Sequence, residues 1–138
     1  MKINLKFLLV FTVLLIFQLF QSSALAWNTY SDLAVELTKN TYILLVKHQV
    51  CEDINKCRAQ ERVFRGGSPD RANVSVYKTN DLSWAAIQDI IKLCLDAYVL
   101  HGGKQTITLQ FFRETIRERN ARFSGIKPFI HLQLKGEK

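Results

Sequence analysis

The chain has 138 residues, of which 48% are hydrophobic and 22% charged, a length and composition that suit one folded domain and exclude two. Nineteen lysines and arginines outnumber twelve acidic residues, so the formal net charge is +7 and anionic partners are favoured in general. Three cysteines exclude a cysteine-rich scaffold, and the stability of the domain must come mainly from an apolar core.

The first 26 residues have the three parts of a signal peptide in the right order. Two lysines open the chain, residues 7–20 are apolar apart from one threonine and one glutamine, and residues 24–26 read Ala-Leu-Ala. Signal peptidase requires small side chains at the first and last of those three positions. The sequence therefore predicts a signal peptide at 1–26 and a single small α+β domain at 27–138, whose net charge is +5 because two lysines are removed.

The alternative for this leader is an uncleaved membrane anchor. A membrane-spanning helix needs about 20 apolar residues, and residues 7–26 reach that length. Gln21, Ser22 and Ser23 dilute its last turn with polar side chains, so cleavage is the favoured interpretation. An uncut leader would leave the same domain attached to the membrane.

The first element predicted in the exported chain is a helix over residues 31–48. Its apolar stripe is formed by Leu33, Leu37 and Leu44. Residues 42–46 would also suit a buried strand, because periodicity does not separate helix from strand over so short a run. The residues between Cys51 and Cys57 are polar and predict a connection.

A β-hairpin is predicted next, with arms at residues 60–64 and 73–78. Residues 66–70 between them read Gly-Gly-Ser-Pro-Asp, and glycine, proline and aspartate favour turns. On the second arm, Val74 and Val76 point to one face of the sheet and their polar neighbours to the other.

Residues 82–100 predict the clearest helix of the chain, which the glycines at 102 and 103 end. The face expected to pack on the core carries residues at spacings of three and four, namely Trp84, Ile87, Ile91, Cys94 and Tyr98. The polar residues largely opposite are Gln88, Asp89, Lys92 and Asp96.

The last part of the chain predicts a strand, a short helix and a strand. Residues 104–112 alternate threonine or glutamine with large apolar residues, as strands do. Residues 113–123 are charged and predict a short helix, which Gly125 and Pro128 interrupt. Residues 129–134 alternate again and predict the final strand.

This order of elements predicts an α+β fold, a two-layer sandwich of a mixed four-stranded sheet with helices packed on one face. A strand, a helix of about five turns and a second strand make a right-handed parallel crossover. Hairpins flank this crossover, so the sheet is expected to be mixed.

Cys51 and Cys57 are predicted to form a disulfide, because export allows oxidation and a polar loop of this length can turn back. The bridge would join the first helix to the first strand and contribute about 2 kcal/mol by loop closure. Cys94 is expected to be a buried, inert thiol. A bridge from Cys94 to either other cysteine, and a nucleophilic role for it, are the alternatives.

A metal site is a further alternative, in which His48, Cys51 and Cys57 would bind with His101 or His131 as a remote fourth ligand. A structural zinc site needs four such ligands. An oxidising compartment favours the disulfide instead, so neither a metal nor a cofactor is expected.

No catalytic residues are predicted. The chain has no G-x-S-x-G, H-E-x-x-H or P-loop pattern, and no two carboxylates have a spacing that implies paired acid–base chemistry. Arginines surround Glu114 and Glu118 in the sequence, so ion pairing explains these two glutamates better than acid–base catalysis does. A hydrolase would require His48 or His131 with a carboxylate that the fold brings close.

The predicted binding residues gather in one basic and aromatic segment, and they are Phe112, Arg113, Arg117, Arg119, Arg122 and Phe123. The alternative is a solvated helix with weak ion pairs. Arginine suits an interface because its planar fork pairs with carboxylates and phosphates. Nucleic acid is not an expected partner, since no binding motif occurs and export removes the usual target.

These observations lead to three functional hypotheses. The first is a small exported, non-enzymatic binding protein of the cell envelope or periplasm, with an acidic envelope or secreted protein as its partner. An inhibitor or immunity-type protein is one concrete form. The second is a structural or assembly component of an envelope secretion or conjugation machine, and the third is a small secreted hydrolase. Contact with a membrane is expected only if the leader stays uncut.

Overall fold

The computed structural model describes residues 31–121 and 125–137. The predicted signal peptide at 1–26 lies outside these residues, and so do Arg122 and Phe123 of the predicted binding segment. Across the described ranges, no helix has the length and apolar character needed to cross a membrane.

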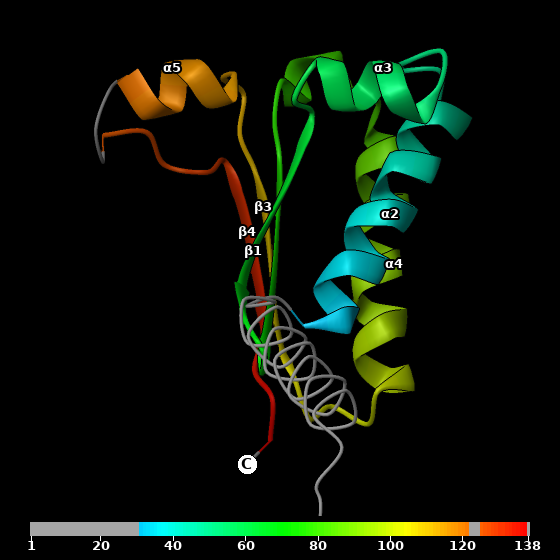
Figure 1. Ribbon diagram of the computed structural model, residues 1–138, viewed down its shortest axis with the longest axis vertical. Coiled ribbons are helices and arrows are strands. Elements are labelled where there is room, and N and C mark those ends of the chain that lie inside the picture. Colours follow the sequence, from blue (N-terminus) through cyan, green and yellow to red (C-terminus); the bar gives the residue numbers. More distant parts are fainter. Residues whose placement is uncertain (1–30, 122–124, 138) are drawn as a thin grey trace, which may run out of the picture.

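The described chain folds into the predicted α+β sandwich (Figure 1). The elements are, in order, α2 (Asp32–Lys47), α3 (Ile54–Ala59), β1 (Val63–Ser68), β2 (Arg71–Val76), the 3-10 turn η1 (Thr79–Asp81), α4 (Trp84–Leu100), β3 (Thr106–Phe111), α5 (Ile116–Ala121) and β4 (Ile130–Leu134). The long helices α2 and α4 pack on one face of the sheet, as predicted. The short helix α5 lies at one end of the sheet, on the opposite side from α2 and α4.

The four strands follow the order β1-β2-β3-β4 across the sheet. The outer pairs β1–β2 and β3–β4 are antiparallel, and the central pair β2–β3 is parallel. Helix α4 connects the two parallel strands, because antiparallel neighbours can be joined by a tight turn and parallel neighbours cannot. The prediction of a mixed sheet is confirmed.

Serine side chains begin both long helices. The hydroxyl of Ser31 accepts a hydrogen bond from the backbone N–H of Ala34, and Ser83 does the same for Ala86, each at 3.1 Å. Such caps satisfy backbone donors that the first helical turn leaves unpaired. The strand alternative for residues 42–46 is wrong, since these residues continue α2.

The core lies between the two long helices and the sheet. Alternate residues of the central strands are buried there, and these are Ala72, Val74, Val76, Ile107, Leu109 and Phe111. The helices cover them with Leu33, Leu37, Leu45, Ile87, Ile90 and Cys94. The alternation of large apolar with polar residues therefore identified the core face of both strands correctly.

Trp84 is the clearest error in the predicted core. Its side chain is 68% exposed, because it is the first residue of α4 and follows the cap directly. The buried face of the helix is shifted, and Ile90 and Ala97 occupy it beside the correctly predicted Ile87 and Cys94. Helical spacing specifies an angle around the axis, but it does not show how far along the axis the sheet extends.

The hairpin prediction is right in kind and wrong in its boundaries. Strand β1 begins at Val63, and both glycines at 66 and 67 belong to it. Ser68 pairs with Arg71, so only Pro69 and Asp70 form the turn. Gly67 has a φ of 110°, and a Cβ there would collide with the carbonyl oxygen of Arg71. Gly67 is therefore required by the close approach of the paired strand, and it is not part of the turn itself.

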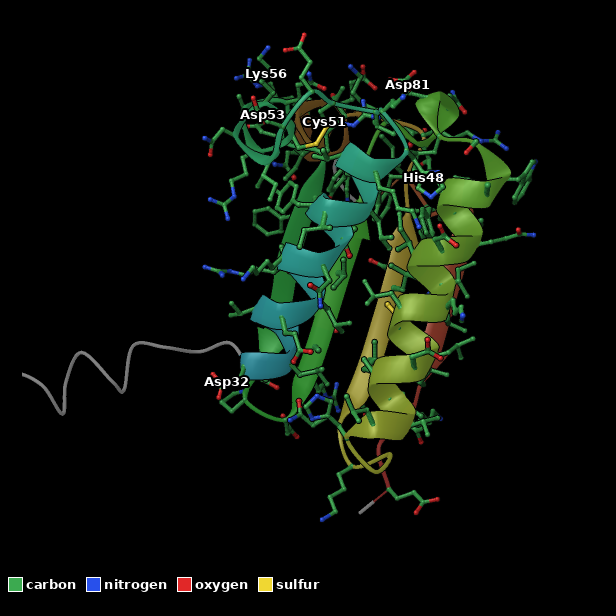
Figure 2. All side chains as sticks on the ribbon, turned by 90° about the vertical axis from the view of Figure 1, so that its right-hand side faces the viewer. Asp32, His48, Cys51, Asp53, Lys56 and Asp81 are labelled. Carbon is green, nitrogen blue, oxygen red and sulfur yellow. A yellow bond between two sulfur atoms is a disulfide. The ribbon has the colours of Figure 1, made fainter. Side chains whose placement is uncertain are left out.

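The unpredicted helix α3 begins in the connection between Cys51 and Cys57 and continues to Ala59. Asp53 begins this helix, since its carboxylate accepts the backbone N–H of Lys56 at 2.8 Å. The predicted disulfide is present, with the two Cα atoms 5.5 Å apart. It joins the segment after α2 to α3 rather than to the first strand, and Figure 2 shows it beside Asp53 and Lys56 at one end of the molecule.

Candidate functional site

Two members of the predicted binding segment are packing residues. The ring of Phe112 is 1% exposed and stacks on Tyr77 with ring centres 5.2 Å apart. Arg119 donates from Nη1 to the Tyr77 hydroxyl oxygen at 2.7 Å, and its guanidinium lies 4.5 Å from the Phe112 ring centre. These contacts hold α5 against the end of the sheet. Phe112 therefore cannot touch a partner, and Arg119 already uses part of its hydrogen-bonding capacity within the protein.

Arg117 is highly exposed and makes one long ion pair. Its side chain is 88% exposed, and its Nε lies 3.8 Å from a carboxylate oxygen of Glu61.

Glu118 accepts the backbone N–H of Thr115 at 3.3 Å, and the Thr115 hydroxyl accepts that of Glu118 at 3.1 Å. These two reciprocal hydrogen bonds cap α5, so Glu118 stabilises the first turn of the helix.

Arg113 lines a cleft that we call the Trp84–Arg113 cleft. Its volume is about 200 Å³, and its lining residues are Thr79, Asn80, Leu82, Trp84, Ile87, Arg113 and Phe129. The guanidinium of Arg113 lies 4.9 Å from the centre of the Phe129 ring. The cleft therefore presents an arginine over an aromatic ring together with an exposed tryptophan, and these side chains come from the start of α4, the segment after β3 and the segment before β4.

Sequence reasoning found Arg113 but missed its companion Trp84. Ser83 is a strong N-cap residue, and it would have placed Trp84 in the first helical turn. The predicted start at residue 82 concealed that position. Phe129 was assigned to a strand, and the sequence contains no signal that it meets Arg113.

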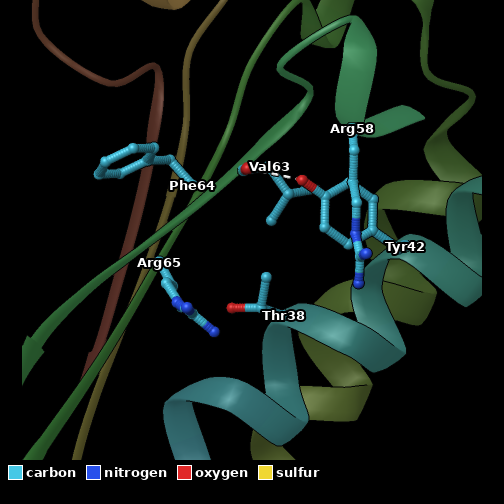
Figure 3. A pocket seen from close by; sticks show the side chains of 6 residues that line it. All are labelled: Thr38, Tyr42, Arg58, Val63, Phe64 and Arg65. Atoms are coloured by element: carbon cyan, nitrogen blue, oxygen red, sulfur yellow. Dashed lines mark hydrogen bonds between the residues drawn. The ribbon is translucent and has the colours of Figure 1, made fainter. Parts of the chain in front are cut away.

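A second cleft lies between α2 and β1, and we call it the Arg58–Arg65 cleft (Figure 3). Its volume is about 490 Å³, and it is lined by Thr38, Tyr42, Arg58, Val63, Phe64 and Arg65. The Tyr42 hydroxyl donates to the carbonyl oxygen of Val63 at 2.9 Å. Burial raises the pKa of Tyr42, and the nearby guanidiniums of Arg58 and Arg65 oppose that shift.

The fold brings His48 and Asp89 together, which the sequence could not show. His48 follows α2 and Asp89 lies in α4, and His48 Nε2 is 2.7 Å from Asp89 Oδ2. This hydrogen bond lowers the pKa of the Asp89 carboxyl. A carboxylate bonded in this way orients an imidazole, which is the arrangement that the hydrolase hypothesis requires.

The other histidines lie apart from this pair. His101 ends α4, with its Nε2 3.7 Å from a carboxylate oxygen of Glu36. His131 is exposed on β4. Cys51 and Cys57 are joined in the disulfide, so their thiolates are not available to a metal in this structure. Among residues 31–121 and 125–137, no group of three metal-ligating residues comes together.

Comparisons with known proteins give no relative. No protein-family model, no curated protein and no solved structure matches the chain. Functional inference therefore depends on the two clefts and the histidine pair.

Proposed function

We propose that this protein is a small exported binding protein, and that the Trp84–Arg113 cleft contacts an acidic surface of another envelope or secreted protein. The observation that carries the proposal is the exposed Trp84 beside an arginine stacked on Phe129. Tryptophan and arginine are the residues that most often dominate protein–protein affinity.

The chemistry of the cleft supports an acidic partner. Arg113 lies over the Phe129 ring, where a cation is attracted to the ring face, and its guanidinium has five N–H donors for hydrogen bonds. A carboxylate can accept two of those bonds at once. The Trp84 ring offers apolar area next to this contact, so a partner would combine an acidic side chain with a neighbouring apolar one.

The proposed compartment is the periplasm or the extracellular space. The leader at residues 1–26 supports export, and the Cys51–Cys57 disulfide is compatible with an oxidising environment. An inhibitor or immunity-type protein is the first form of this proposal, because a small domain can block a partner through one contact surface.

Site-specific photo-crosslinking in the producing cells tests the proposal. A photo-reactive phenylalanine analogue replaces Trp84 in one variant and Val99, which is 75% exposed at the other end of α4, in the control. We expect a crosslinked product of defined mass from position 84 and none from position 99.

Charge reversal in the same experiment tests the acidic partner. Arg113→Glu should abolish the product from position 84, whereas Arg71→Glu, which changes the same charge in the hairpin, should leave it intact. A product that survives Arg113→Glu, or that forms equally from position 99, contradicts the proposed interface.

A hydrolase is the second candidate, because the His48–Asp89 hydrogen bond has the geometry of an oriented base. Hydrolysis of an activated ester such as p-nitrophenyl acetate is the measurement. A saturable rate that His48→Gln removes would favour this candidate. Our first proposal predicts that the wild-type protein and His48→Gln give the same background rate.

A further inference from the structure

The Arg58–Arg65 cleft brings two cations to one concavity from different parts of the chain. Arg58 lies in α3 and Arg65 in β1, and Figure 3 shows their side chains entering from two sides, with Thr38 between them and the Tyr42 ring beside Arg58. Phe64 points away from this group. No acidic residue is among the described side chains that line the cleft.

The two arginines are held by different elements. Arg58 lies over the Tyr42 ring, 5.7 Å from its centre, where a cation is attracted to the face of the ring. Arg65 extends from a paired strand, where it is opposite Val74. The positive charges of Arg58 and Arg65 both favour the ionised form of Tyr42, and they partly oppose the rise in its pKa that burial causes.

The other polar side chains of the cleft, the hydroxyls of Tyr42 and Thr38, already donate hydrogen bonds within the protein, so the arginines are the donors for a ligand. The Tyr42 hydroxyl donates its proton to Val63, and the Thr38 hydroxyl donates to the Ala34 carbonyl at 2.7 Å. A guanidinium has five N–H donors, so it can bind a ligand while it keeps a contact within the protein. A ligand of this cleft must therefore be an acceptor, and the local charge favours an anion.

We propose that the Arg58–Arg65 cleft binds a phosphate group, either as inorganic phosphate or as the terminal group of a phosphate monoester. A carboxylate is planar and is matched by a single guanidinium fork. Two forks that approach from different directions suit a tetrahedral dianion, which offers acceptor oxygens on several sides. The open mouth of the cleft leaves room for the remainder of a monoester.

This site is independent of the proposed protein interface. The Arg58–Arg65 cleft lies at the β1 edge of the sheet, and the Trp84–Arg113 cleft is built by the start of α4 and the segments that follow β3 and precede β4. The two proposals share no residue, so either can fail while the other holds.

An NMR titration of the purified protein tests phosphate binding. Inorganic phosphate, glycerol phosphate and acetate are added separately at constant ionic strength, while the Arg58 and Arg65 side-chain Nε–H signals and the Thr38 amide are followed. We expect saturable shifts with both phosphates, and acetate binding at least about tenfold weaker, as expected for a planar monoanion. Saturation by glycerol phosphate alone would assign the site to monoesters and refine the proposal.

Arginine variants distinguish a site from general attraction to a basic protein. Arg58→Gln and Arg65→Gln should each weaken phosphate binding by about tenfold or more. Arg71→Gln removes the same charge from an exposed position on β2 and should leave binding unchanged. Far-UV circular dichroism confirms that each variant is folded.

Three results would overturn the proposal. They are shifts that rise linearly without saturation, equal binding of acetate and phosphate, and equal weakening by Arg71→Gln and the two cleft variants. None of them bears on crosslinking from position 84.

Discussion

At the scale of single residues, neighbours decide the chemistry of groups that look alike in the sequence. Arg62 illustrates this, since its side chain is only 2% exposed and donates to Asp81 at 3.0 Å. Nothing in its sequence surroundings separates it from the exposed Arg58 and Arg65. A charged residue becomes buried only where the fold supplies a partner, and here η1 supplies it.

Cys94 should be unreactive in the folded protein. Its thiol is buried, and the loss of solvation raises its pKa to about 12, so almost no thiolate exists at neutral pH. Iodoacetamide followed by mass spectrometry, without a reducing agent, should add a single group after unfolding in urea and none before. Labelling of the folded protein at the rate of a free cysteine would contradict this prediction.

The His48–Asp89 hydrogen bond should make the free energy of unfolding depend on pH in the acidic range. The pKa of the Asp89 carboxyl lies below its ordinary value of 3.8 in the folded chain, chiefly because of His48, so the folded state binds fewer protons than the unfolded state between the two values. The stabilisation is present above pH 3.8 and is lost as the pH falls through the folded pKa.

Urea unfolding at several pH values checks this dependence. Asp89→Asn should be less stable than wild type near neutral pH, and the difference should vanish under strongly acidic conditions. Asp96→Asn, on the same helix, is the control and should show no such pH-dependent difference. A difference between wild type and Asp89→Asn that stays constant down to the lowest pH would argue against the ionised carboxylate as its source.

At the scale of elements, short segments depend on side-chain contacts more than on their own propensity. Helix α5 has six residues, none of them buried, and an isolated helix of that length is not stable in water. The Thr115–Glu118 cap and the contacts of Arg119 with Tyr77 and Phe112 stabilise it.

Arg119→Ala should therefore destabilise the protein by about 1–2 kcal/mol, the sum expected for one hydrogen bond and one cation–π contact. Arg117→Ala should cost less than about 0.5 kcal/mol, because its ion pair is long and exposed. Urea denaturation of both variants measures the contrast. Equal losses of unfolding free energy would mean that Arg119 does not anchor α5.

At the scale of the whole molecule, the core combines residues that are distant in the chain. Leu109 lies in a central strand and is completely buried, with β2 on one side, β4 on the other and the helices above. This contact pattern predicts that the domain unfolds as one cooperative unit.

Leu109→Ala should lower the free energy of unfolding by about 2–5 kcal/mol through lost apolar contact and the cavity that remains. Val99→Ala, at a highly exposed position, should change it by about 0.5 kcal/mol or less. Circular dichroism in the far and near ultraviolet should report the same transition for each. Separate transitions at the two wavelengths would contradict a single core.

The amino-acid pattern by itself determined the order of the two long helices and the four strands, the mixed sheet and the core faces of β2 and β3, but it did not predict α3. These features follow from local chemistry, because alternation over a few residues decides which side of a strand is apolar. The Cys51–Cys57 bridge was also predictable, since its partners are close in the chain.

Only the tertiary structure decided which charged and aromatic residues form sites. It separated Arg113, which lines a cleft with Trp84, from Arg119, which packs on Phe112. It also placed Arg58 and Arg65, which belong to two different elements, in the lining of one cleft. The physical reason is that a binding surface depends on distances between side chains in space, whereas a local pattern specifies only the face of its own helix or strand.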